Sequence, residues 1–98
     1  MTKIVYNGCF GGFGLSDAAW ERYQELGGTA KRAYDLDHDE YRADPVLVQV
    51  VEELGDRANT RFSDLRIRDV PAGTKYRIDE YDGNESVMTV DDYEWSVA

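Results

Sequence analysis

The pattern of apolar and polar residues predicts a strand followed by a helix in the first quarter of the chain. Residues 3–6 contain two β-branched residues and an aromatic, which is typical of a strand. Ser16 has the chemistry of a helix N-cap, and Gly27 that of a helix end. Between them, apolar side chains recur at the spacing of one helical face, at Leu15, Ala19, Tyr23 and Leu26.

The middle of the chain predicts a second helix. Asp44-Pro45 is a strong helix start, because Asp caps the free N–H groups and Pro fits the first turn. Apolar residues then recur up to position 54, and Gly55 predicts the end of the helix. The flanking segments are less regular. Residues 29–34 could be a short helix or an extended link, and the polar residues 56–63 could extend the second helix irregularly.

The last third predicts strands. Residues 65–70 and 74–81 alternate between apolar and charged side chains, Asp82-Gly83 is a hairpin signal, and residues 86–90 would form the return strand. The element order β-α-α-β-β-β predicts an α+β fold, with two main helices packed on one face of a small, mainly antiparallel sheet. We expect residues 1–98 to form a single domain.

The charge of the chain excludes several classes of partner. Eleven basic and twenty acidic residues give a net charge of −9, so direct binding to DNA, RNA or an anionic membrane is disfavoured and a basic protein surface is favoured. No segment approaches the roughly 20 apolar residues of a membrane span. Cys9 is the single cysteine, so an internal disulfide is excluded. Without a disulfide or a signal peptide, we expect a cytoplasmic protein.

A glycine-rich turn before a helix, as at residues 7–14, is one pattern of a phosphate site. It contains Gly8, Gly11, Gly12 and Gly14, a spacing that matches neither common phosphate-binding motif, and no basic residue lies between Lys3 and Arg22. We therefore predict a packed turn, in which Phe10 and Phe13 fill the core.

The sequence contains no complete motif for a catalytic or a metal-binding site. Cys9 and His38 could form a nucleophile and its base, but nothing in the sequence places them together. The triplet Asp35, Asp37 and Asp39 resembles the start of a calcium loop, although its sixth position is a glutamate and the residue that should be the bidentate Glu is a valine. We predict a solvated acidic loop and no catalytic residue, metal or cofactor.

The acidic residues are the most informative feature. After Arg77 there is no basic residue, while seven acidic residues occur in the last 21. Carboxylates on one face of a strand lie about 6.6–6.8 Å apart, close to the spacing of every second phosphate along a DNA strand. This spacing permits DNA mimicry; an acidic surface that serves solubility is the alternative. The candidate partner-binding residues are Asp35, Asp37, Asp39, Glu40, Asp79, Glu80, Asp82, Glu85, Asp91, Asp92 and Glu94, with the interleaved aromatics Tyr81, Tyr93 and Trp95.

Three stretches resemble a family of small proteins carried by phages and prophages. The most specific is the start of the chain, residues 3–16, which reads KIVYNGCFGGFGLS. Residues 44–55 and 78–83 fit the same pattern. In its small size and acidity the chain is also similar to anti-CRISPR proteins, in particular to an inhibitor of type I-C systems. That resemblance implies a stoichiometric inhibitor that binds a Cas protein of the Cascade complex and blocks target DNA.

Three hypotheses therefore follow from the sequence. The first is a non-enzymatic, monomeric inhibitor whose carboxylates engage a basic DNA-binding surface of a host protein, with the aromatics as anchors. The second is a phage accessory protein that binds a host protein through an apolar surface at Phe10 and Phe13. The third is a small enzyme or ligand-binding domain that uses Cys9.

Overall fold

The structure is a computed structural model that describes residues 2–89. Its elements follow the predicted order, with three short 3-10 helices added, and they confirm the α+β class. In chain order they are β1 (Thr2–Asn7), α1 (Asp17–Glu25), η1 (Ala33–Asp37), η2 (Asp39–Tyr41), α2 (Pro45–Leu54), η3 (Gly55–Ala58), β2 (Leu65–Val70), β3 (Tyr76–Tyr81) and β4 (Asn84–Thr89).

Both predicted helix starts are capped by side chains. The Ser16 hydroxyl accepts a hydrogen bond from the Ala19 N–H at 3.1 Å, and the Asp44 carboxylate accepts one from the Val46 N–H at 2.9 Å. The second carboxylate oxygen of Asp44 accepts from the Tyr23 hydroxyl at 2.6 Å. One residue thus caps α2 and holds it against α1, so the cap also fixes the packing of the two helices.

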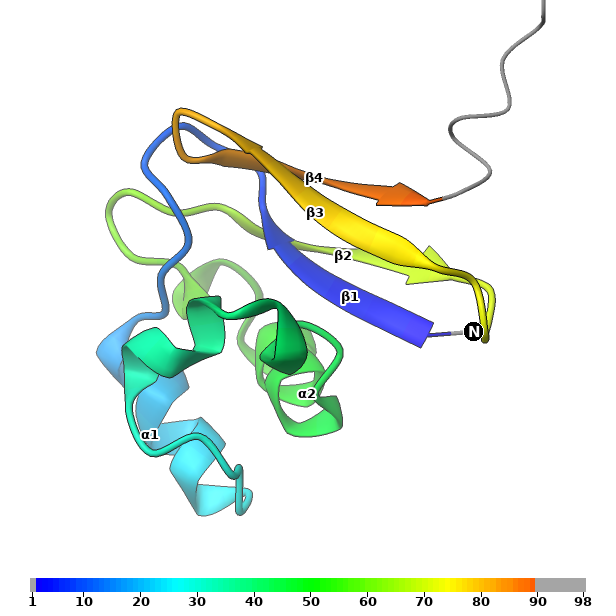
Figure 1. Cartoon of the computed structure of the whole chain (residues 1–98). Helices are drawn as coiled ribbons and strands as arrows, with labels where there is room; N and C mark the ends of the chain where they lie inside the picture. The colour runs from blue at the N-terminus through cyan, green and yellow to red at the C-terminus, as the bar shows by residue number, and fades with distance from the viewer. Residues whose placement is uncertain (1, 90–98) are drawn as a thin grey trace, which may run out of the picture.

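The strands form two antiparallel pairs rather than one sheet. β1 pairs with β2 from Thr2↔Val70 to Asn7↔Leu65, and β3 pairs with β4 as a separate hairpin. The hairpin lies across the β1–β2 ribbon, on the side away from α2 (Figure 1). The difference from the predicted single sheet has a physical reason. Alternating apolar residues specify which face of a strand is buried, but they do not specify the neighbouring strand.

The β1–β2 ribbon is the middle layer of the molecule. Val5 faces the larger core cluster with residues of α1 and α2, whereas its neighbour Ile4 packs with Val70 and Val87. Successive residues of a strand point to opposite faces, so β1 is buried on both sides. The hairpin is therefore held by a small apolar cluster, and polar contacts add to it.

Short 3-10 helices form in the two parts of the chain that the sequence pattern left open, before and after α2. Residues 33–41 form η1 and η2 with Leu36 buried, and residues 55–58 form η3, which directly follows α2 and covers only the start of the polar segment 56–63. In the part of the chain that the structure describes, no helix has both the length and the apolar character needed to cross a bilayer.

Candidate functional site

A buried arginine stands at the centre of the polar contacts. Arg42 directly follows η2 and is only 1% exposed. Its two terminal nitrogens lie 2.7 Å from the two carboxylate oxygens of Glu85 on β4, a bidentate ion pair. It also donates to the carbonyl and carboxylate oxygens of Asp37, each at 2.9 Å. Arg42 therefore ties η1 to the β3–β4 hairpin.

The ring of Phe13 covers the same guanidinium. The central carbon of Arg42 lies 3.9 Å from the centroid of that ring, in cation–π geometry. Arg42 also donates to the carbonyl oxygen of Val5 on β1 at 3.3 Å. The Arg42 charge is desolvated, and it is compensated by two carboxylates, backbone carbonyls and an aromatic face.

Asn7, at the end of β1, extends this network to the loops. Its side-chain amide donates to the carbonyl oxygens of Cys9 and Gly83, at 2.7 and 2.8 Å, and its backbone N–H donates to Glu85 at 2.8 Å. Its amide oxygen accepts from the N–H of Asp64 at 2.7 Å. Three separate segments thus meet at one fully buried residue: the end of β1 with its glycine-rich turn, the loop at Asp64 and the hairpin.

Arg42 and Asn7 were not singled out from the sequence. A signal for Arg42 is present, because it is the only basic residue between Arg32 and Arg57, in a stretch rich in carboxylates. Asn7 carries no such signal. Its role depends on contacts with residues 57 and 76 positions away, at Asp64 and Gly83.

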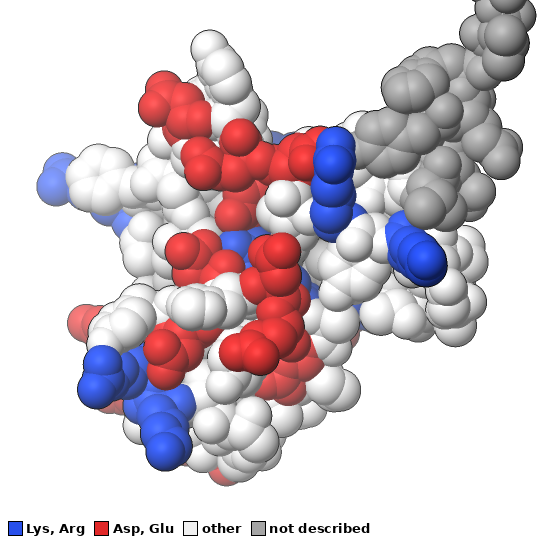
Figure 2. All heavy atoms as spheres, in the orientation of Figure 1, with Lys and Arg blue, Asp and Glu red and all other residues white. Residues whose placement is uncertain are grey.

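The result of this network is an acidic face. Asp37 and Glu80, from η1 and β3, line one depression of about 220 Å³ beside Phe13. Figure 2 shows acidic side chains gathered over η1, η2 and the hairpin turn, with basic side chains both among them and toward the edges of this view. We use "acidic face" for the carboxylates of these elements that remain at least partly exposed, namely Asp35, Asp37, Asp39, Glu40, Glu80 and Asp82.

Glu85 does not belong to this face. Its residue exposure is 8%, and both carboxylate oxygens are held by Arg42. The sequence placed it among the partner-binding residues because acidic side chains are usually solvated. The structure instead pairs Glu85 with Glu80 directly across the hairpin. Two facing carboxylates repel each other, and Arg42 neutralises the buried one.

The strand register also changes the spacing argument. Asp79 and Glu80 are consecutive on β3 and point to opposite faces, so β3 carries no row of carboxylates at the spacing of phosphates. Asp79 pairs with Arg77 at 2.9 Å, and Tyr81 is 79% exposed. The carboxylates gather instead because 3-10 helices and a hairpin turn meet. The other candidates, Asp91, Asp92, Tyr93, Glu94 and Trp95, lie outside the described residues.

The backbone of the glycine-rich turn packs against the loop at Phe62, while one of the two phenylalanine rings of the turn is exposed to solvent. Phe13 contacts the core, but Phe10 is 63% exposed, so the prediction that Phe10 fills the core was wrong. The reason is steric. A Cβ on Gly11 would lie 1.8 Å from the carbonyl oxygen of Phe62, so the backbones themselves are in contact and leave no room beneath the turn for the Phe10 ring.

Cys9 is held by the same loops. Its thiol is 3.0 Å from the carbonyl oxygen of Phe62 and 3.5 Å from the amide oxygen of Asn7. His38 lies between η1 and η2 and is exposed. Within residues 2–89, no group of three or more His, Cys, Asp and Glu side chains is arranged to hold a metal ion.

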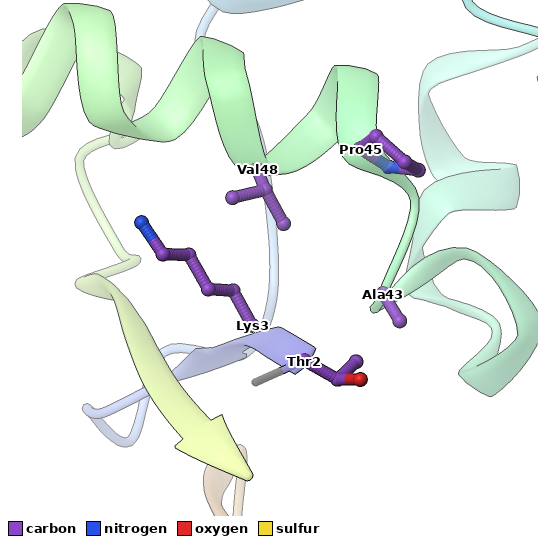
Figure 3. A pocket seen from close by; sticks show the side chains of 5 residues that line it. All are labelled: Thr2, Lys3, Ala43, Pro45 and Val48. Carbon is purple, nitrogen blue, oxygen red and sulfur yellow. The ribbon is translucent and has the colours of Figure 1, made fainter. Parts of the chain in front are cut away.

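A further hollow of about 300 Å³ lies between the start of β1 and α2 (Figure 3). It is lined by Thr2, Lys3, Ala43, Pro45 and Val48. Lys3 is the one charged residue of this lining, and its ammonium lies 2.7 Å from the Glu52 carboxylate. That ion pair raises the pKa of Lys3, so its ammonium stays protonated and is a poor base.

Comparisons with protein-family models, with curated proteins and with solved structures found no match to this chain.

Proposed function

We propose that this protein is a non-enzymatic inhibitor that uses its acidic face to occupy a basic, nucleic-acid-binding surface of another protein. The observation that carries the proposal is the convergence of Asp37 and Glu80 from segments 43 positions apart (80 − 37 = 43) at one depression. The buried Arg42 stabilises this arrangement through Asp37 and Glu85. A surface kept acidic for solubility alone would not need a buried cation to hold two acidic segments together.

Electrostatics supports the same partner. The net charge of −9 repels nucleic acid and attracts a surface built from lysines and arginines. Exposed charges act over about one Debye length, roughly 10 Å at 0.1 M salt, so the location of the charge matters as well as its sum. Binding through the acidic face is therefore expected to be fast and to weaken as salt is added.

The particular partner rests on the sequence. The resemblance of residues 3–16 to a phage and prophage family, together with small size and acidity, supports a Cas protein of the type I-C Cascade complex as the partner. In this proposal the acidic face competes with target DNA, and the aromatic Tyr81 beside it supplies exposed contact area.

The test is a plaque assay in a bacterium whose type I-C system targets a phage. Expression of the wild-type chain should restore plaques. Asp39→Lys/Glu40→Lys, which reverses two exposed charges on the acidic face, should abolish the restoration. Glu21→Lys/Asp56→Lys is the matched control, because it changes the same number of exposed charges on α1 and η3 and should still restore plaques. Equal activity of the two double variants would refute binding through the acidic face.

A further inference from the structure

Two exposed phenylalanines, Phe10 and Phe62, are carried by loops that touch each other. Phe10 is 63% and Phe62 66% exposed. Their segments are in contact at Gly11, where an added Cβ would lie 2.6 Å from the Phe62 Cβ. Large apolar side chains that adjoin one another on a surface are typical of protein-binding sites. We call the pair the Phe10–Phe62 surface.

The backbone beneath this surface is fixed, although the rings are in solvent. The Cys9 thiol lies 3.0 Å from the Phe62 carbonyl oxygen, and the Gly8 N–H donates to the Asp64 carbonyl oxygen at 2.8 Å. The Thr60 hydroxyl accepts from the Phe62 N–H at 3.1 Å. The two rings are therefore presented by hydrogen-bonded loops, which lowers the entropy cost of binding through them.

The hairpin side of this surface is acidic. A Cβ on Gly83 would lie 2.4 Å from the Phe10 carbonyl oxygen, so the hairpin turn touches the peptide of Phe10. The Gly83 N–H donates to the carboxylate of Glu80 at 3.0 Å, and the neighbouring Asp82 is exposed. Two cations are nearby: Arg61 is exposed next to Phe62, and Arg66 lies against Gly8, where an added Cβ would be 2.6 Å from its Nε. Arg66 is already paired with the Asp64 carboxylate at 2.8 Å.

We propose that the Phe10–Phe62 surface binds a basic protein segment, in which an apolar side chain contacts the two rings and flanking lysines or arginines face Glu80 and Asp82. Charge complementarity favours this occupant over a second copy, because two chains of charge −9 would bring acidic hairpin turns together. The inference shares with the proposed function the basic character of the partner and two carboxylates of the acidic face, Glu80 and Asp82. It adds an apolar anchor that the acidic face does not supply.

The test uses the full chain as bait for a phage-displayed library of random short peptides. Selection on the wild type is followed by counter-selection on the Phe10→Ala/Phe62→Ala variant. Both rings are exposed, so this variant should fold, which circular dichroism would verify. Tyr34→Ala is the matched control, because Tyr34 is 63% exposed but lies on η1.

The proposal expects enriched peptides that carry an apolar residue flanked by lysine or arginine. Their affinity, measured by fluorescence anisotropy, should fall at least about tenfold in the Phe10→Ala/Phe62→Ala variant and stay unchanged in Tyr34→Ala. Peptides without basic residues, equal binding to the double variant, or no enrichment would overturn it. A concentration-dependent dimer that the double substitution abolishes would also overturn it, in favour of a second copy. The peptide selection uses no Cascade protein. Its outcome therefore does not depend on the plaque assay that tests the proposed function.

Discussion

Replacement of Arg42 by methionine should be among the most damaging single substitutions in the described part of the chain. Methionine keeps an unbranched apolar stem against Phe13, but it leaves the Glu85 carboxylate without its bidentate partner. The side chains of Arg42 and Glu85 are 1% and 7% exposed, so water cannot replace the lost contacts without rearrangement. Removing one partner of a buried ion pair typically costs about 3–5 kcal/mol. A domain of this size has a total stability of about 5–15 kcal/mol.

A second substitution separates the charge effect from the loss of packing. Glu85→Gln removes the buried charge, while its amide oxygen can still accept from the N–H of Asn7, as the carboxylate does at 2.8 Å. In the Arg42→Met background, Glu85→Gln should therefore restore about 1–3 kcal/mol. In the wild-type background the same change should destabilise, because Arg42 loses its bidentate counter-ion.

The assay is urea denaturation of the four proteins of this double-mutant cycle, followed by circular dichroism. The m-value is fitted for each protein along with the free energy of unfolding, because a changed m-value reveals a change in the denatured state. The account predicts strong coupling between the two positions. Losses that add to within about 0.5 kcal/mol, or an Arg42→Met variant within about 1 kcal/mol of wild type, would refute the interpretation of Arg42 as the residue that joins η1 to the hairpin.

Three further predictions concern stability. Gly11→Ala should lower the free energy of unfolding by at least about 2 kcal/mol, because its Cβ would lie 1.8 Å from a backbone oxygen; Gly14→Ala, whose nearest contact is 3.2 Å, should cost less in the same urea titration. Asp44→Ala should cost about 1–2 kcal/mol through loss of the α2 cap, measured by thermal unfolding. Burial raises the pKa of Tyr23, so the folded state holds this proton more tightly and stability falls as pH rises above about 10. Tyr23→Phe should weaken that alkaline decline; an unchanged pH profile would contradict this assignment.

The sequence predicted which helices and strands form better than it predicted which of them pack or pair with one another. Ser16, Asp44 and the hairpin signal at Asp82-Gly83 act through residues close in the chain, so local chemistry determines them. The pairing of β2 with β1 and the crossing of the hairpin over that ribbon are decided by contacts between distant residues, such as Ile4 and Val87. Alternation of apolar residues is compatible with several pairings, and only the packed structure distinguishes them.

The candidate site was likewise predicted only in part from the sequence. Composition indicated an acidic surface, and most of its carboxylates in the described chain are indeed exposed or partly exposed. Composition could not show that Glu85 is buried by Arg42, or that Phe10 is excluded from the core by backbone contact at Gly11. Both outcomes depend on which loops approach each other, and the approach is mediated by Asn7.

Competition for target DNA on purified type I-C Cascade tests binding through the acidic face most directly. A fluorescent target duplex is titrated with the wild-type chain, with Asp39→Lys/Glu40→Lys and with Glu21→Lys/Asp56→Lys, at low and at moderate salt. The two variants have the same net charge, −5, because each reversal adds two to −9. The account predicts that the wild type and the Glu21/Asp56 variant displace DNA, less well as salt rises, whereas the Asp39/Glu40 variant does not. Displacement by both variants alike, or by neither the wild type nor any variant, would contradict it.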